Sequence, residues 1–206
     1  MDGLSNHPTN RKGEFSVNTR RLTFLIILTA LCVALQISPR PPNVEFTSFF
    51  SFVVGTMEGI TVVAYFSSLV MLINGVLSPY GFGGLNIPFQ ITGMIIAGVL
   101  GSVYRKFTPN LSFSARFSLE TAVLGAVIAL VYDLITNSGV ALGLVLAGES
   151  TSLAFLTALG NGSFFSLIHI VSNSIVFGAL FLPVMNALNI LKIGEFTWSK
   201  KERLYS

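Results

Sequence analysis

Polar side chains that could bind or activate a small molecule occur within long apolar stretches of this chain. Asp133 and Asn137 are four residues apart, as are His169 and Asn173, so each pair shares one face if its segment is helical. Together with Glu45, the carboxylate and the imidazole are also groups that perform general acid–base catalysis. These residues predict a polar binding site, and the acid–base centre of a membrane enzyme is the alternative.

A second group of candidate residues lies in the stretch from Asn74 to Gln90, which joins two apolar runs. It contains two prolines and four glycines. Glycine permits backbone conformations closed to other residues, and proline fixes φ, so the stretch is expected to have a defined irregular shape. The side chains in it that could contact a ligand are those of Asn74, Tyr80, Phe82, Asn86 and Gln90.

Several common chemistries are excluded by missing motifs. There is no G-x-x-x-x-G-K-[ST] loop for ATP and no H-E-x-x-H pair for zinc. The G-x-S-x-G elbow of serine hydrolases is also missing. With two histidines and one cysteine, the chain lacks paired metal-ligand spacing. We therefore expect no catalytic residues, no metal and no cofactor of the chain's own.

The composition is that of an integral membrane protein. Hydrophobic residues make up 52% of the 206 residues, charged residues only 10%, and the mean hydropathy is +0.75. An ordinary soluble domain is about 25% charged. The single cysteine, Cys32, excludes an intramolecular disulfide. The predicted fold class is an all-α integral membrane protein.

Apolar runs and their interruptions predict six transmembrane helices. The first ends at the proline cluster 39–42, because prolines cannot continue a helix. The run 46–77 is read as two short helices joined by a tight turn at 55–58. Residues 137–161 are read as a long connection that contains Gly, Ser and Thr and is partly embedded in the membrane. The remaining predicted spans are 21–37, 88–104, 117–136 and 162–191.

The basic residues decide the topology, because cytoplasmic loops collect Lys and Arg. Six spans place eleven of the twelve basic residues on one side and only Arg40 on the other, whereas five spans divide them. We therefore predict a compact bundle of six transmembrane helices with both termini cytoplasmic. The predicted organisation is a disordered tail at 1–20, a six-helix domain at 21–191 and a basic tail at 192–206.

In this topology the polar candidates gather near the outer surface, where they could line a cup for a small molecule. Structural alternatives remain, since Asn137 could cap a helix and His169 could be a satisfied core residue. Glu45 and Asp133 could likewise be solvated charges. The expected substrate-binding residues are Asn43, Glu45, Asn74, Tyr80, Phe82, Asn86, Gln90, Asp133, Asn137, His169 and Asn173.

Several segments carry a family resemblance. They are Ala30-x-x-x-Ala34, the segments 42–47 and 55–59, Asn74-Gly75 followed by 79–83, and Gly93 to Gly101. In these segments, and over roughly residues 20–192, the chain resembles the substrate-binding S component of an energy-coupling factor (ECF) transporter. The resemblance implies a vitamin or related micronutrient as ligand, bound in an outward cup at the cell membrane of a prokaryote.

The same resemblance implies partners. These are a transmembrane coupling subunit, which would dock on Ala30 and Ala34, and two cytoplasmic ATPases, through which alone ATP would act. The aromatic and amide side chains of the cup suit a flat, ring-containing ligand such as a cofactor precursor. A stand-alone secondary transporter or channel is the alternative, although no repeat relates residues 20–104 to 105–192.

Overall fold

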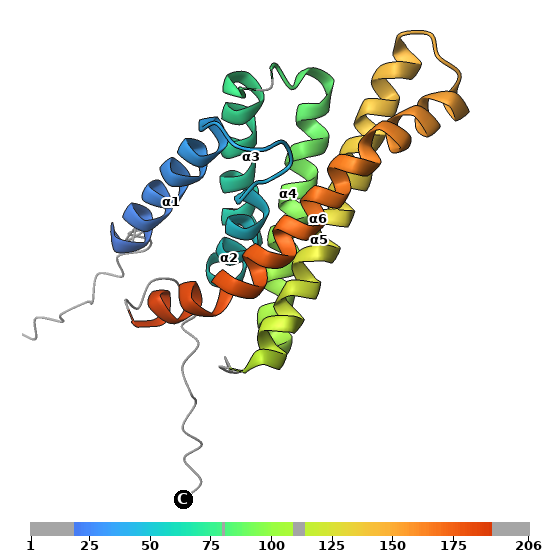
Figure 1. Ribbon diagram of the computed structural model, residues 1–206. Helices are drawn as coiled ribbons and strands as arrows, with labels where there is room; N and C mark the ends of the chain where they lie inside the picture. Colours follow the sequence, from blue (N-terminus) through green and yellow to red (C-terminus); the bar gives the residue numbers. More distant parts are fainter. Residues whose placement is uncertain (1–18, 80, 109–113, 191–206) are drawn as a thin grey trace, which may run out of the picture.

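The computed structural model describes residues 19–79, 81–108 and 114–190, and within these ranges the secondary structure is entirely helical (Figure 1). The predicted tails therefore lie outside the described residues, except for Thr19 and Arg20, which begin the first helix. The elements are α1 (Thr19–Ile37), α2 (Thr47–Glu58), α3 (Ile60–Leu77), the 3-10 turn η1 (Gly84–Asn86), α4 (Ile87–Phe107), α5 (Ala115–Leu146) and α6 (Thr151–Ile190).

The six predicted α-helices are present, but they differ in length. Four segments, formed by α3, by η1 with α4, by α5 and by α6, are long and apolar enough to cross a membrane. The apolar part of α1 (Arg21–Ile37) is shorter, and α2 has 12 residues, about 18 Å at 1.5 Å per residue. The chain is thus compatible with a multi-pass membrane protein, and six crossings with cytoplasmic termini stay a prediction.

The turn between α2 and α3 is tighter than predicted. We expected residues 55–58 to form it, but they are helical, and the chain turns at Gly59 alone. Gly59 has a φ of 84°, a conformation that side chains disfavour. Gly55 serves packing instead, because a Cβ there would lie 1.9 Å from the carbonyl oxygen of Gly98 on α4. The backbones of α2 and α4 are therefore in direct contact.

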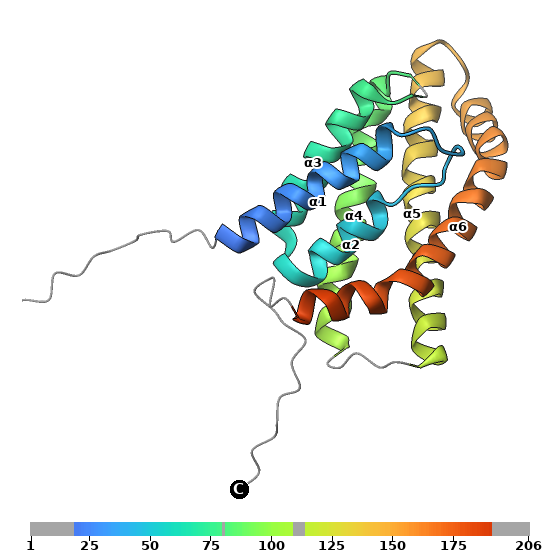
Figure 2. The ribbon, with the colours of Figure 1, turned by 60° about the vertical axis from the view of Figure 1, so that its left-hand side comes forward.

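The long connection predicted at residues 137–161 is wrong. Helix α5 continues to Leu146 and α6 begins at Thr151, which leaves only residues 147–150 between them. Hydroxyl groups that suggested a loop bond back to the helix, as Ser138 Oγ does to the carbonyl of Leu134 at 2.8 Å. Small side chains, Ala141 and Ala158 among them, pack the two helices together. The resulting hairpin extends past the ends of α3 and α4 (Figures 1 and 2).

The core is centred where α2 and α6 cross. Phe49 and Phe52 of α2 meet Phe177 of α6 edge to face, with both ring centroids 5.3 Å from that of Phe177. All three side chains are fully buried.

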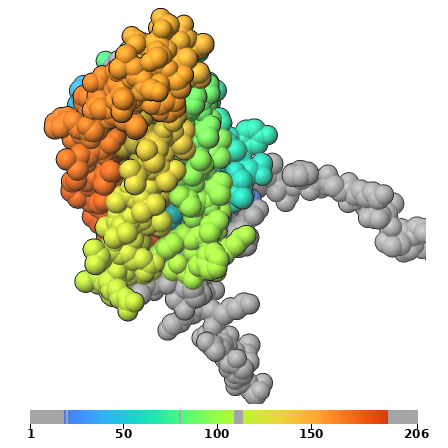
Figure 3. Space-filling view, turned by 90° about the vertical axis from the view of Figure 1, so that its right-hand side faces the viewer, coloured from blue at the N-terminus to red at the C-terminus, as the bar shows by residue number. Residues whose placement is uncertain are grey.

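The outward faces of the helices are apolar too. Figure 3 shows the face on which α6, α5 and α4 lie side by side. Exposed leucines such as Leu134 and Leu167 are typical of a lipid-facing surface.

An ion pair closes the end of the bundle at which α1 begins. Arg21 of α1 bonds through Nε to the carboxylate of Glu58, at the end of α2. The Glu58 side chain is fully buried, whereas that of Arg21 is 26% exposed. Because a buried carboxylate needs a cationic partner, this pair ties the start of α1 to the turn between α2 and α3.

Candidate ligand-binding site

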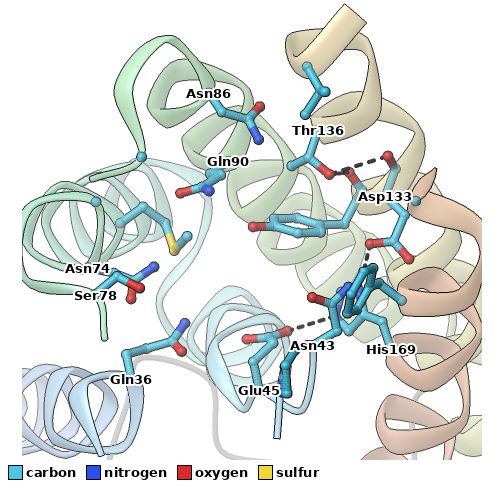
Figure 4. Close-up of a pocket in the computed structure, with 18 of the residues that line it drawn as sticks. Gln36, Asn43, Glu45, Asn74, Ser78, Asn86, Gln90, Asp133, Thr136 and His169 are labelled. Atoms are coloured by element: carbon cyan, nitrogen blue, oxygen red, sulfur yellow. Dashed lines mark hydrogen bonds and ion pairs between the residues drawn. The ribbon is translucent and has the colours of Figure 1, made fainter. Parts of the chain in front are cut away.

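A cavity of about 540 Å³ lies between the helix ends (Figure 4). It is at the end of the bundle opposite the Arg21–Glu58 pair. It is bordered by the end of α1, the connection from α1 to α2, the end of α3, η1 and the start of α4, and by α5 and α6. Small-molecule sites usually measure about 300–1,000 Å³. The cavity is therefore large enough for a ligand of vitamin size.

Most of the side chains predicted to bind a ligand line this cavity. Nine of the eleven do so, and they are Asn43, Glu45, Asn74, Phe82, Asn86, Gln90, Asp133, Asn137 and His169. Tyr80 lies outside the described residues. Asn173 does not line the cavity. It is fully buried, and its amide donates to the backbone oxygen of His169 at 3.2 Å, which is a structural role.

Glu45, Asp133 and His169 form a buried ion-pair cluster beside the cavity. His169 Nδ1 lies 2.8 Å from Asp133 Oδ1, and His169 Nε2 lies 3.1 Å from Glu45 Oε1. An ionised carboxylate only accepts hydrogen bonds, so with both carboxylates ionised both ring nitrogens donate and the ring is an imidazolium. The cluster joins α5, α6 and the connection from α1 to α2.

The carboxylate of Glu45 is held by several further donors. It accepts from the backbone N–H of Thr47 at 2.5 Å and from that of Ser48 at 3.1 Å, the first amides of α2. A carboxylate at this position is also stabilised by the helix dipole. Burial alone would raise the pKa of Glu45, but the hydrogen bonds from His169 and Ser48 lower it to about 2. Glu45 is therefore a buried anion at neutral pH.

The Ser48 hydroxyl lies between two acceptors and can serve one of them at a time. It is within hydrogen-bond distance of Glu45 Oε1, and it lies 2.9 Å from Asn173 Oδ1. A hydroxyl has a single hydrogen to donate. This contact links Asn173, which does not border the cavity, to the polar residues that do. It also gives the fully buried amide of Asn173 a hydrogen-bond partner.

The connection between α1 and α2 is held by side chains that the sequence did not single out as site residues. Arg40 donates to the backbone oxygen of Val44 at 2.9 Å and to the side-chain oxygen of Gln36. Gln36 in turn donates to Thr47 Oγ1 at 2.6 Å. Asn43 has a φ of 61°, which Asn tolerates better than most residues. One feature of the sequence could have identified these residues as part of the site. Gln36 and Arg40 are polar, lie four residues apart and follow an apolar run.

The opposite side of the cavity carries carboxamides whose oxygens have no partner among the described residues. Asn74 is in the last turn of α3, Asn86 lies in η1 and Gln90 is in the first turn of α4; we call these three the amide wall. Their side-chain oxygens are buried, and none accepts a hydrogen bond from the part of the chain that the structure describes. Buried polar groups are nearly always paired, so the amide wall is a place where a ligand could bind.

Glycines shape the connection that carries the amide wall. Gly81 and Gly84 have φ values of 101° and 51°, and the N–H of Gly83 donates to the oxygen of Gly75 at 2.8 Å. The residues just before α4 are thus folded back against the end of α3. The prediction of a shaped segment is confirmed, since positive φ values at Gly81 and Gly84 are conformations that favour glycine.

Tyr132 also borders the cavity and was not among the predicted contacts. Its ring meets that of His169 edge to face at a centroid distance of 5.4 Å. Gly93 on α4 makes room for this ring, because a Cβ there would lie 2.5 Å from Tyr132 Cδ2. The position of Tyr132 directly before Asp133 was the only available signal. The other lining residues not predicted are Met71, Ser78, Met94, Thr136, Val140, Phe165 and Ser166, besides Pro42 and four glycines.

Two glycines on the long hairpin leave room for amides of the site. A Cβ on Gly139 would lie 2.3 Å from Asn86 Oδ1, and a Cβ on Gly162 would lie 2.5 Å from Asn137 Oδ1. The helical extension of α5 beyond its predicted end adds Asn137 and Val140 to the lining of the cavity, whereas the lining residues of α6 lie within its predicted span. The two helices could not approach the amides so closely with larger residues in place of these glycines.

The bonding of His169 bears on whether this ring could act as a general base. Both nitrogens of His169 are engaged by carboxylates, so the ring has no free lone pair with which to accept a proton from a bound molecule. The described residues contain no group of three or more His, Cys, Asp or Glu arranged to hold a metal ion.

No family model, no curated protein and no solved structure matches this chain.

Proposed function

We propose that this chain is the substrate-binding S component of an ECF-type importer. It would capture a vitamin or related micronutrient in an outward-facing cup of a prokaryotic cell membrane. A transmembrane coupling subunit and two cytoplasmic ATPases would then drive its delivery inward. The observation that carries the proposal is the cavity of about 540 Å³ at one end of a bundle of apolar helices, with three carboxamide oxygens that have no partner among the described residues.

The positions of the basic residues support an outward cup. Arg21 lies at the start of α1 and Gln36 near its end, beside the cavity. Arg105 and Lys106 are in the last turn of α4, whereas Gln90 is near its start. The cationic ends of these helices are thus opposite to the cavity. Since basic residues collect on the cytoplasmic side, the cavity would face outward.

The surface of α1 is consistent with a partner subunit in the membrane. Ala30 and Ala34 are both exposed and lie on one face of the helix, four residues apart. Exposed small residues allow the helix of another subunit to approach closely, which is how helices associate in a membrane. This sequence contains no phosphate-binding loop of the G-x-x-x-x-G-K-[ST] type. Any ATP-driven transport would therefore need ATPases on other chains.

Uptake measurements test the proposal. The protein is purified, and the small molecule bound to it is identified by mass spectrometry. Uptake of that compound is then measured in cells that express the chain alone, with an ECF coupling subunit and its ATPases, or with ATPases whose phosphate-loop lysine is replaced. We expect uptake only with the intact module. Uptake by the chain alone would indicate a stand-alone carrier, and chemical conversion of the compound would indicate a membrane enzyme.

A further inference from the structure

The polar groups around the cavity divide into groups already bonded within the protein and groups left free. This division limits which ligands fit. A bound molecule must form hydrogen bonds with the free groups, whereas groups bonded within the protein are less available to it. The inference rests on the proposed function, since it concerns the ligand of the same cavity.

The cationic groups of the cavity are already bonded. Both ring nitrogens of His169 are taken by Asp133 and Glu45. The guanidinium of Arg40 donates to the oxygens of Gln36 and Val44. An anionic ligand is normally held by charge-assisted bonds from Arg, Lys or imidazolium. Here such a ligand would compete with the bonds that His169 and Arg40 already make within the protein.

Among the described residues, the buried acceptors of the cavity that have no partner are three amide oxygens and one carboxylate oxygen. The side-chain oxygens of Asn74, Asn86 and Gln90 have no partner among the described residues, and neither does Asp133 Oδ2. Asp133 lines the cavity although its side chain is only 6% exposed. Its free oxygen would repel an anion and attract an N–H group or a cation.

The geometry points to an uncharged or singly cationic ligand with N–H and C=O groups side by side. We propose that this cavity binds a compound bearing lactam, ureide or carboxamide edges, and that it rejects carboxylates and phosphates. Carboxamides offer a donor and an acceptor together, which is the pattern that such an edge complements. In Figure 4 the amide wall lies across the cavity from Asp133, so one molecule would contact both sides.

The first experiment measures which charge class of solute stabilises the protein. A low-molecular-weight extract of prokaryotic cells is separated at neutral pH into anionic, neutral and cationic fractions by ion exchange. Each fraction is added to ligand-stripped protein in detergent, and the melting temperature is recorded. We expect the neutral or the cationic fraction to raise the melting temperature and the anionic fraction to leave it unchanged.

Substitutions in the amide wall form the second part. Asn74→Leu and Gln90→Met keep the side-chain size and remove the amide, and Asn186→Leu is the matched control, because Asn186 is exposed on α6 away from the cavity. We expect each of the first two variants to need about tenfold more of the active fraction for the same shift. The control should behave like the wild type.

Each outcome decides a separate question. If only the anionic fraction stabilises the protein, the ligand class is wrong, although a solute-binding function stands. If a neutral or cationic fraction stabilises the wild type and both amide variants equally, the amide wall does not bind the ligand. That result would contradict the inference. If no fraction has an effect, the proposed function itself is contradicted.

Discussion

His169 Nδ1 lies 2.8 Å from Asp133 Oδ1, and this contact joins α6 to α5 beside the cavity. The two residues are 36 positions apart in the chain, and both are almost completely buried. Because the other ring nitrogen of His169 meets Glu45, the imidazole holds two carboxylates that would otherwise repel each other. The histidine is thus a structural cation between α5 and the connection from α1 to α2.

Removing one member of this pair should destabilise the protein strongly. Asp133→Ala leaves a buried imidazolium with one partner, and breaking a buried ion pair costs about 3–5 kcal/mol. We expect a large drop in the melting temperature in detergent. Glu149→Ala, at an exposed carboxylate between α5 and α6, is the control and should have little effect.

A double substitution separates the pair from its surroundings. If the contact is the cause, Asp133→Leu combined with His169→Leu should lose less stability than the sum of the two single changes. Strict additivity of the three variants would mean that the two residues do not stabilise each other.

The contact between α2 and α4 should be sensitive to a single methyl group. Gly55→Ala would place a Cβ 1.9 Å from the backbone oxygen of Gly98, so the helices must separate and the melting temperature should fall by several degrees. Gly143→Ala is a matched control within α5, with no atom within 4 Å of the added carbon. It should be neutral or slightly stabilising, since alanine favours a helix over glycine by about 0.5–1 kcal/mol. Equal effects of the two changes would argue against close helix contact.

Gly162→Ala should weaken ligand binding without unfolding the protein, if the proposed function holds. The added carbon would lie 2.5 Å from Asn137 Oδ1, the end of a side chain that can move aside. The carboxamide would thereby be displaced within the cavity, and the affinity for the co-purified ligand should fall about tenfold. Gly160→Ala, two residues away with open space around it, should bind normally in the same titration.

Acid should remove the contribution of Glu45 to stability. Its pKa is about 2 in the folded protein, below the ordinary value of 4.5, so its stabilising effect is complete above about pH 4.5 and is lost as the pH falls toward 2. The difference in melting temperature between the wild type and Glu45→Gln should therefore be largest at neutral pH and shrink below pH 4.5. A difference that stays constant down to pH 3 would contradict the ionised state of Glu45.

Enlarging the small face of α1 should separate transport from binding. Ala30→Leu combined with Ala34→Leu leaves the cavity untouched, because neither residue lines it. We expect normal ligand binding and loss of uptake in cells that carry the complete module. Ala187→Leu, also an exposed alanine but on α6, is the control and should transport normally. Loss of binding in the double variant would show that this face packs within the chain.

The sequence alone was sufficient to predict six helices, but not the full length of the last two, and it predicted where most of the polar candidates meet. Apolar runs, the prolines after Ile37 and the basic residues are local signals, and they indicate six helices and the end at which Asn74, Asn86 and Gln90 gather. Helix formation depends on neighbours within a few residues, which is why such patterns can be read directly.

Tertiary structure decided which polar groups pair and which stay free. Glu45 and His169 are 124 residues apart, so no local pattern shows that one satisfies the other. Residues 137–161 had a loop-like composition, yet packing between α5 and α6 made them mostly helical. Whether a buried polar side chain is structural, like Asn173, or open to a ligand, like Gln90, depends on the partners that packing brings within hydrogen-bond distance.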